Sequence, residues 1–195
     1  KKLTTGQVES LTATQVRSIP SQNISYLGTD QVQALSTASV SGLTTNQFTQ
    51  LTTAQIQAVS TQQMRALTAP QVTAMTTAQA GALSADQLTA LGVTAFGALN
   101  RYHIEALSTT TISALDTSVI RSLSNTQIAS FTTSQLGALS DEQVKSVTSS
   151  QFNAFNVTNF TKLSGSQLQA IDVSTFAAIT PNLIGYLTKD QVSLL

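Results

Sequence analysis

Apolar residues recur at two fixed positions of an eight-residue repeat that runs along the whole chain. The first position, counted from Leu3 to Leu195, is apolar in every octad, and the sixth, from Val8 to Val192, is apolar in all 24. No insertion or deletion interrupts the count. A period this strict is typical of a solenoid, in which each repeat buries its apolar face on neighbouring repeats.

The polar positions of each octad predict the start of an α-helix. The second position is Ser, Thr, Asn or Asp in 21 of the 24 octads, and the fifth is Gln in 15 of them. In Thr52 and Gln55, for example, the hydroxyl can accept from the amide three residues on, while the Gln side chain returns to the Thr amide. The apolar first and sixth positions also have the spacing of a hydrophobic staple. One octad therefore encodes a complete helix start.

A helix of this repeat cannot stand alone. It holds only about six residues, and isolated helices shorter than about 12 residues are marginal in water. The eighth position is Ala, Ser or Gly in 19 of the 24 octads, which implies a close neighbour there. We predict an all-α solenoid of about 24 very short capped helices, one per octad, as a single continuous domain over residues 1–195. The number of octads per superhelical turn and its handedness stay open.

A β-solenoid is the main structural alternative, suggested by the high Thr content. Its weakness is parity, because the apolar positions alternate at spacings of five and three, both odd. A strand would therefore point successive apolar residues to opposite faces. Gln and Ala are also poor strand formers.

Charges and prolines support the helical register. Acidic residues gather at the second to fourth positions and basic residues at the seventh or eighth, where each suits the helix dipole. Pro70 and Pro181 fall in a predicted first turn, where no amide donor is needed. Pro20, at a cap position, departs from the pattern.

Composition disfavours several function classes. Ser and Thr make up more than a quarter of the chain, whereas charged residues make up 9%. The 9 Lys and Arg balance the 9 Asp and Glu, so no basic field favours nucleic acid. With no Cys and a single His, metal chemistry has few ligands. We therefore expect no nucleic-acid partner, no cofactor and no metal site.

The capping rhythm breaks from Gly92 to about Leu123, and this stretch holds the densest polar cluster of the chain, residues 100–105. His103 and Glu105 could form an acid/base or metal pair. The interpretation we favour places His103 at the Gln position, where a ring nitrogen takes over the return bond of the capping box, and Glu105 on an exposed seventh position. We predict no catalytic, cofactor-binding or metal-binding residue and no enzymatic activity.

Two further patterns carry little chemistry. Asp141 and Glu142 are adjacent carboxylates, but neighbouring helical residues point about 100° apart, and both suit a solvated first turn. Asn23, Asn156 and Asn159 begin glycosylation sequons, which arise readily by chance in a chain rich in Asn, Ser and Thr. No localisation follows from them.

The repeat resembles a known kind of tract. Residues 51–58, Leu-Thr-Thr-Ala-Gln-Ile-Gln-Ala, resemble the Leu-Thr-Thr-x-Gln-Val-x-Ala octads of very long bacterial secreted and surface proteins, including adhesin-like exoproteins. The resemblance covers the whole chain and carries no active site. It implies an extracellular or cell-surface stalk. No apolar run reaches the roughly 18 residues of a membrane span, and the chain begins Lys1-Lys2-Leu3, so we expect a segment of a longer protein.

Three functions of different classes follow from these observations. The first is a structural repeat domain, a stalk, spacer or adhesive rod whose partners are flanking repeats or domains of the same polypeptide. The alternative is a binding module that holds a peptide or glycan along the solenoid, although Tyr26, Tyr102 and Tyr186 are scattered rather than clustered. Ice binding through Thr arrays is a lesser alternative, because the ranks of Thr are broken.

Overall fold

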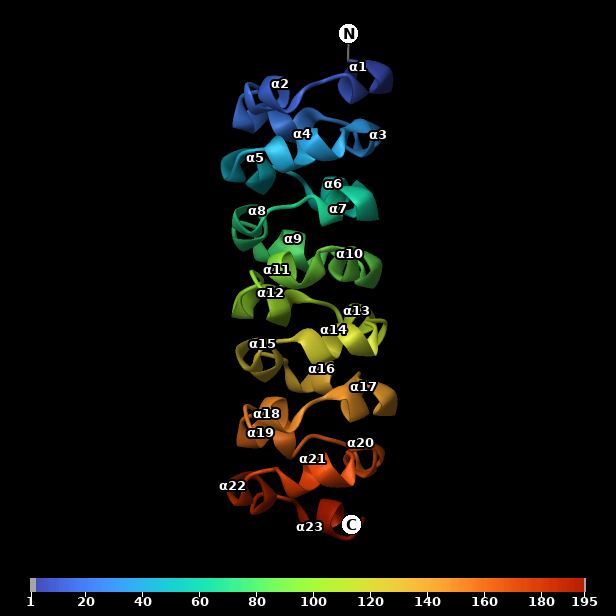
Figure 1. Ribbon diagram of the computed structural model, residues 1–195, viewed down its shortest axis with the longest axis vertical. Helices are drawn as coiled ribbons and strands as arrows, with labels where there is room; N and C mark the ends of the chain where they lie inside the picture. The colour runs from blue at the N-terminus through green and yellow to red at the C-terminus, as the bar shows by residue number, and fades with distance from the viewer. Residues whose placement is uncertain (1–2, 195) are drawn as a thin grey trace. The chain divides into compact units, whose positions relative to one another are not determined.

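The described part of the chain, residues 3–194, is helical, with turns and short linkers and no strand. In this computed structural model the chain divides into two compact units, Lys1–Leu107 and Ser108–Leu195. The described residues form 23 α-helices and one 3-10 helix, one for each octad (Figure 1). The predicted all-α fold is confirmed, and the β-solenoid alternative is wrong. The single continuous solenoid over residues 1–195 stays a prediction.

The helices of the first unit are five or six residues long. They are α1 (Thr5–Glu9), α2 (Ala13–Arg17), the 3-10 helix η1 (Ser21–Tyr26), α3 (Thr29–Ala34), α4 (Thr37–Gly42), α5 (Thr45–Thr49), α6 (Thr53–Ala58), α7 (Thr61–Arg65), α8 (Ala69–Thr73), α9 (Thr77–Gly81), α10 (Ala85–Ala90), α11 (Gly92–Phe96) and α12 (Arg101–Ala106).

The second unit repeats the same elements. They are α13 (Thr109–Ser113), α14 (Thr117–Ser122), α15 (Asn125–Ala129), α16 (Thr133–Gly137), α17 (Asp141–Ser146), α18 (Ser149–Phe152), α19 (Val157–Phe160), α20 (Gly165–Gln169), α21 (Val173–Ala177), α22 (Pro181–Ile184) and α23 (Lys189–Val192). α22 begins at Pro181 and α8 has Pro70 in its first turn, as the sequence predicted.

Two extended residues separate one helix from the next and turn the chain between them. After α6, Val59 has φ −62° and ψ 122°, and Ser60 has φ −69° and ψ 159°. The Val59 amide donates to the carbonyl of Ile56 at 3.1 Å, which closes the helix with a tight last turn. In such octads the first and second positions therefore serve as a linker, and the apolar residue in it is held against the preceding helix.

Three octads make one coil of each unit. In the first unit α3 packs on α6, α6 on α9 and α9 on α12; in the second, α14 packs on α17 and α17 on α20. Each of these pairs joins octads that are three apart in the chain, which is 24 residues. The sequence left the number of octads per turn open, and the packing of the helices decides it.

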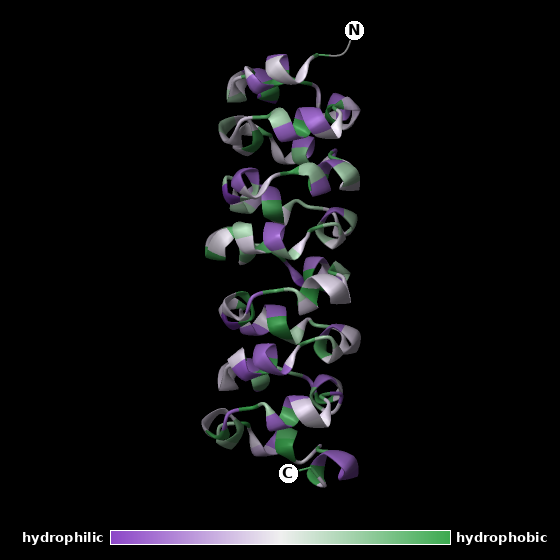
Figure 2. Ribbon diagram, turned by 90° about the vertical axis from the view of Figure 1, so that its right-hand side faces the viewer, coloured by the Kyte–Doolittle hydropathy of each residue, from purple (hydrophilic) through white to green (hydrophobic). Residues whose placement is uncertain are grey.

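The first and sixth positions form the core, and their side chains face the coils on opposite sides of their own coil. Sixth-position side chains from Val8 to Leu168 are all buried, and first-position side chains from Leu35 to Ile179 are all buried. Hydrophobic residues consequently recur in every coil of the ribbon (Figure 2). Burial of one such side chain contributes about 1.5–3 kcal/mol, so stacked coils supply the stability that single helices lack.

The eighth position lies against the preceding coil. A Cβ atom placed on Gly42 would come within 2.7 Å of the Cβ of Ala13, a third-position residue of α2. The close neighbour predicted from the small residues is confirmed at this position. Bulk is excluded there because the backbones of two coils approach one another.

Two octads depart from the pattern for identifiable reasons. Pro20 has no hydroxyl to accept a cap bond, and the helix after it is the 3-10 helix η1 instead of an α-helix. Gly92 has φ +69°, a conformation that favours glycine. Leu91, in the α region, links α10 directly to α11 without a side-chain cap.

Candidate functional site

The second and fifth positions close the start of most helices as the capping box predicts. At α6, Oγ1 of Thr52 accepts from the amide of Gln55 at 3.2 Å, and Oε1 of Gln55 accepts from the amide of Thr52 at 2.7 Å. Thr52 itself is extended, with φ −70° and ψ 162°. The predicted Thr/Ser-to-Gln box is confirmed at α6 and also at α1, α2, α5, α7, α8, α9, α10, α15, α16, α17, α18, α20 and α23.

The same glutamine also holds a helix of the preceding coil. Nε2 of Gln55 donates to the carbonyl of Leu27 at 2.7 Å and to that of Ile24 at 3.2 Å. The Gln55 side chain is only 2% exposed. One buried amide therefore caps the start of its own helix with its oxygen and the end of another helix with its nitrogen.

The carbonyls that accept these bonds belong to the end of a short helix, where intrahelical donors run out. The Ile24 carbonyl already accepts from the Leu27 amide at 3.1 Å, and Gln55 supplies its second donor. Leu27 is extended, with φ −63° and ψ 138°, so its carbonyl points away from its own helix. Without the glutamine amide, these buried acceptors would lose the donor that replaces water.

The bond recurs at intervals of eight residues, and we call this series the glutamine ladder. In each member Nε2 reaches the first-position carbonyl 28 residues earlier, at 2.6–3.0 Å. Its members within the first unit are Gln31, Gln47, Gln55, Gln63, Gln71, Gln79 and Gln87, and within the second Gln143, Gln151, Gln167 and Gln191.

His103 replaces a glutamine in the ladder. Nδ1 of His103 accepts from the Asn100 amide at 3.2 Å, and Oδ1 of Asn100 accepts from the His103 amide at 3.1 Å. Nε2 lies 2.8 Å from the carbonyl of Met75, again 28 residues earlier, so it carries the proton. The predicted return bond to the cap is confirmed. The side chain is 3% exposed and bonds backbone groups through both ring nitrogens.

Glu105 forms an ion pair with Arg101 on the surface of α12. Oε1 of Glu105 lies 2.6 Å from Nε of Arg101, one helical turn away. The hydrogen bond and the charge of Glu105 raise the pKa of the Arg101 guanidinium above its ordinary value. An exposed pair of this kind contributes little to stability. Within residues 100–105, His103 is thus part of a buried helix cap, whereas Glu105 belongs to an ion pair on the surface.

The acidic residues of the predicted first turns lie where the sequence placed them. Asp141 and Glu142 are exposed in the first turn of α17. Oδ1 of Asp116 accepts from the Ser118 amide at 2.7 Å and caps α14. Hydrogen bonds from Ser118 lower the pKa of the Asp116 carboxyl.

The stretch of residues 171–186 is held differently. Asp172 and Thr180 make no side-chain cap bond, although both stand at the second position. Asn153, at the seventh position of an earlier octad, compensates in part: its Nδ2 donates to the Ala178 carbonyl at 3.0 Å, and its Oδ1 accepts from the Thr180 amide at 2.9 Å. The side-chain caps predicted at Asp172 and Thr180 are therefore wrong.

The repeat itself decides the family. A family model described as the ALTTAQ repeat matches residues 1–37, 24–61 and 112–149, which together cover just over half of the chain. The chain belongs to the ALTTAQ repeat family. A search of curated proteins gave no match. The tandem-repeat tract inferred from the resemblance is confirmed.

The donor role of the ALTTAQ glutamine was missed by the sequence analysis, yet a signal for it exists. A capping box accepts Glu as readily as Gln at its third helical residue, and a helix start favours the acid. No octad of the chain has Glu at the fifth position. The exclusion of Glu indicates that the position must donate as well as accept a hydrogen bond.

Other chemistry is sparse in the ALTTAQ octads. Residues 3–194 contain no cluster of three His, Cys, Asp or Glu side chains placed to hold a metal ion. Within that range no helix has the length and apolar character needed to cross a bilayer. Of the sequon residues, Asn159 is 4% exposed and donates to the Phe131 carbonyl at 3.1 Å, so its amide is committed to the core.

Proposed function

We propose that the chain is a structural repeat domain that acts as a stalk, spacer or adhesive rod in an extracellular bacterial protein. The observation that carries this proposal is the glutamine ladder. Its amides, such as Gln55 and Gln143, are buried and bonded to the backbone of the preceding coil of their unit. The ladder glutamines therefore hold the coils together and are not available to a ligand.

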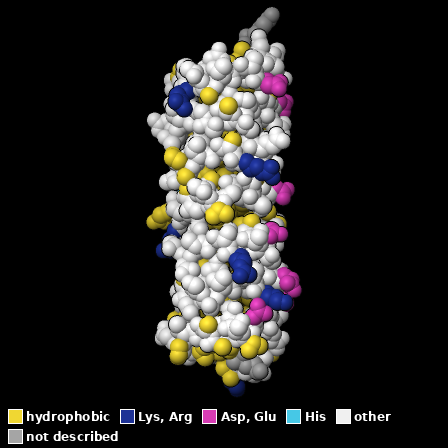
Figure 3. All heavy atoms as spheres, viewed as in Figure 1, with side chains coloured by type: hydrophobic (Ala, Val, Ile, Leu, Met, Phe, Trp, Pro, Cys, Tyr) yellow, Lys and Arg dark blue, Asp and Glu magenta, His cyan; other side chains and the backbone are white. Residues whose placement is uncertain are grey.

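The outward surface supports a mechanical role. Exposed second, third and fourth positions are mainly hydroxyl and small side chains, and charged side chains stand singly or in small groups on the face drawn in Figure 3. Such a surface stays hydrated without offering one strong attractive field. The resemblance to tracts of secreted and surface proteins supports the extracellular setting.

The alternative of a peptide- or glycan-binding module has less support. Recognition surfaces are enriched in clustered aromatic and Arg side chains. Tyr26, Tyr102 and Tyr186 are exposed, but they belong to η1, α12 and the residues after α22, each without an aromatic neighbour in contact. The only aromatic pair in contact among the described residues, Phe152 and Phe155, is buried.

A spacer built in this way should have a length set by its coil count. Packed helices lie about 10 Å apart, so one coil of three octads adds about that distance within a unit. The experiment places the chain between a membrane anchor and a fluorescent domain and measures energy transfer to dyes in the membrane. Deletion of residues 35–58, one whole coil, should shorten the distance by about 10 Å and preserve helical circular dichroism.

The matched control deletes residues 35–54, which breaks the octad frame and should lower helicity. A Gly/Ser linker as long as the whole chain provides the flexible reference, whose reach scales with the square root of its length. The spacer role is contradicted if the whole-coil deletion leaves the distance unchanged, or if the chain and the flexible linker give the same distribution of distances.

A further inference from the structure

Residues 91–98, the octad of α11, have no hydrogen-bonding side chain at the two positions that tie other helices into the solenoid. The second position is Gly92 and the fifth is Ala95. Leu91 is in the α region, with φ −57° and ψ −27°, so the extended linker seen after α6 is absent. No side chain caps α11. The amides at its start therefore lack the capping box of the regular octads.

Every other helix from α3 to α12 is tied to the coil before it through its fifth position. In α11 the same register pairs Ala95 with the carbonyl of Leu67, and a methyl group cannot donate a hydrogen bond to it. In the other helices a side-chain nitrogen or oxygen lies 2.6–2.9 Å from the carbonyl 28 residues earlier. These side chains are Gln31, Ser39, Gln47, Gln55, Gln63, Gln71, Gln79, Gln87 and His103.

Apolar burial seats α11 on α8 instead. Leu91, Ala95 and Phe96 are 4–5% exposed. Release of α10 would break the bond from Gln87 to the carbonyl of Val59, 2.8 Å long, in addition to exposing apolar surface. A buried acceptor that loses its donor carries a free-energy penalty of its own. Release of α11 from the preceding coil avoids this penalty.

Glycines stand at both ends of α11. Gly92 has φ +69°, and Gly97 follows the last residue of the helix. Glycine gains more backbone entropy than any other residue when structure is lost. The start of α12 is closed independently, because the side chains of Asn100 and His103 each accept from the other's amide, at 3.1 and 3.2 Å. Opening of α11 therefore leaves the cap of α12 in place.

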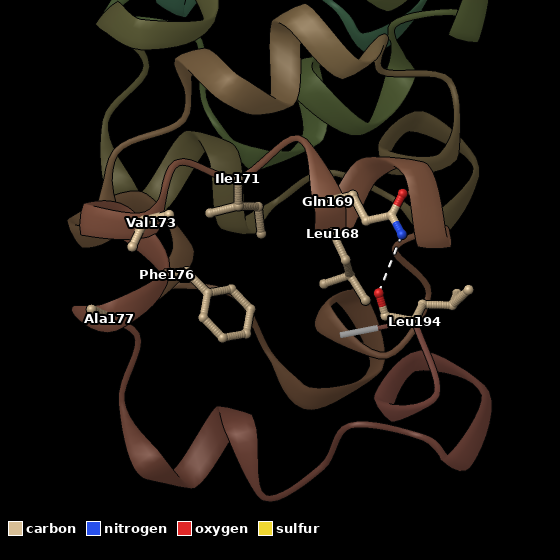
Figure 4. Close-up of a pocket in the computed structure, with 7 residues that line it drawn as sticks. All are labelled: Leu168, Gln169, Ile171, Val173, Phe176, Ala177 and Leu194. Carbon is tan, nitrogen blue, oxygen red and sulfur yellow. Dashed lines mark hydrogen bonds between the residues drawn. The ribbon is translucent and has the colours of Figure 1, made fainter.

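Helix α21 of the second unit also has no side-chain cap, but it is packed less closely. Its sixth-position Phe176 is half-buried and borders a hollow of about 380 Å³, as Figure 4 shows. Phe96, at the same position of α11, is 4% exposed. What distinguishes α11 from its neighbours is thus the absence of polar ties and not a gap in the packing.

We propose that residues 91–99 open and close as a unit. In this local opening α11 leaves its seat on α8 and returns, while α10 and α12 stay capped and tied to the preceding coil. The open form exposes Ala95 and Phe96 and lets the first unit lengthen at one octad. Under tension, this octad yields before the other helices from α3 to α12. The opening is independent of the spacer role, because it follows from bonds within the first unit.

Hydrogen exchange of the unaltered chain tests the opening at two identical tripeptides. Residues 81–83 and 97–99 are both Gly-Ala-Leu and stand at the ends of α9 and α11. The amides of Ala82 and Ala98 each donate to the carbonyl three residues earlier, at 3.2 and 3.1 Å. Exchange followed by NMR should be at least about tenfold faster at Ala98, because α11 opens without breaking a ladder bond. Equal rates would overturn the proposal.

Low concentrations of urea separate local opening from unfolding of the unit. A local opening exposes little surface, so the exchange rate at Ala98 should be nearly independent of urea. Exchange at Ala82 should accelerate with urea, because it requires a larger opening. A parallel rise at both amides would mean that Ala98 exchanges through unfolding of the unit, and the proposal would be wrong.

Replacement of residues 91–98 by the sequence of residues 51–58 restores both ties. The new octad has a capping box, and its glutamine amide is in register with the carbonyl of Leu67. Exchange at position 98, which remains alanine, should slow by about tenfold after correction for the intrinsic rate. Val93→Thr, at a side chain that is 75% exposed, is the control and should leave this rate unchanged. A helical variant that exchanges as fast as the unaltered chain would contradict the opening.

The reverse change removes both ties from α9. Thr76→Gly combined with Gln79→Ala deletes the cap bond and the bond from Gln79 to the carbonyl of Leu51, which is 2.7 Å long. Exchange at Ala82 should then become at least about tenfold faster. Gln62→Ala, at an exposed position of α7, should have no effect on it. If Ala82 keeps its slow exchange in the double variant, the ties do not set the rate of opening and the proposal fails.

Discussion

Residues 43–90 and residues 171–186 are built on the same octad but are held in different ways. In the first stretch every fifth position is Gln, and each of these side chains is at most 5% exposed and bonded to the coil before it. In the second, the fifth positions are Thr175 and Leu183, and neither helix has a side-chain cap. The helices form in both stretches.

The comparison separates two contributions that the regular octads combine. First-position side chains stay buried in both stretches, as at Leu51 and Ile179, so the apolar pattern alone suffices to place a short helix on its coil. The polar bonds can be supplied from another position, as by Asn153. The ladder therefore adds stability and register to a coil whose position the core already determines.

The largest expected difference between the stretches lies in the core. Phe48→Ala removes a sixth-position ring that is 0% exposed and should lower the free energy of unfolding by about 3–5 kcal/mol. Phe176→Ala makes the same change at a half-buried ring and should cost less than about half as much. Urea melts followed by circular dichroism measure both. Equal losses would mean that the second stretch is packed as tightly as the first.

The ladder can be removed from one stretch and added to the other. Gln55→Glu keeps the capping box but loses the donor to Leu27 and Ile24, at an expected cost of about 1–3 kcal/mol. Thr175→Gln should stabilise by about 0.5–1.5 kcal/mol, because the carbonyls 28 and 31 residues before it can accept. Gln57→Glu, exposed on the same helix as Gln55, is the control. No gain from Thr175→Gln would show that the second stretch cannot seat a ladder amide.

His103 tests whether the ladder depends on geometry or on the glutamine itself. His103→Gln should change the free energy of unfolding by less than about 0.5 kcal/mol, since Gln supplies the same acceptor and donor. His103→Ala should cost about 1–3 kcal/mol by leaving the Met75 carbonyl without its partner. Thermal melts of both variants compare them. A large loss in His103→Gln would give the imidazole a role beyond its two bonds.

The caps should differ between the stretches. Thr52→Ala removes an observed cap bond and should lower the free energy of unfolding by about 1 kcal/mol. Thr180 makes no cap bond, so Thr180→Ala should lower it by less than about 0.5 kcal/mol. Thr52→Ser keeps the hydroxyl and serves as the control. Urea melts in which the two Ala variants are indistinguishable would contradict the capping assignment at α6.

The smallest expected effect is the dependence of stability on acidic pH through Asp116. The pKa of Asp116 is lowered by its bonds to Ser118, so its contribution to stability is present above the ordinary carboxyl pKa and is lost as pH falls through the lowered value. Because the carboxyl is fully exposed, solvent screening keeps this contribution small. Asp116→Asn should flatten the acid limb of the pH–stability curve.

Much of the local structure follows from particular residues. Thr52 and Gln55 predict a helix start at α6, and Pro181 predicts the first residue of α22. The apolar positions exclude strands because their spacings, five and three residues, are odd numbers. His103 was assigned to a cap because it stands at the Gln position, and its bonds to Asn100 agree. These features depend on neighbours within about eight residues, which the sequence states directly.

The features that the sequence did not predict correctly depend on contacts between distant octads. Asp172 and Thr180 carry good cap residues, yet their helices are held by Asn153 from an earlier octad, a contact that no local rule describes. The donor role of Gln55 was missed because its acceptors lie 28 and 31 residues away. The exclusion of Glu from the fifth position is the sole trace of that role in the sequence.

The amino-acid sequence by itself determined the repeat, the helical class, most of the caps and the two core positions, since each depends on side chains within one octad or on simple periodicity. Only the tertiary structure decided that three octads form a coil. That number depends on how far the backbone must turn before Gly42 can approach Ala13 and before a glutamine amide can reach the first-position carbonyl 28 residues earlier. Both contacts join octads that are three apart in the chain, which no local pattern relates. The two contacts form together only when three octads complete one coil.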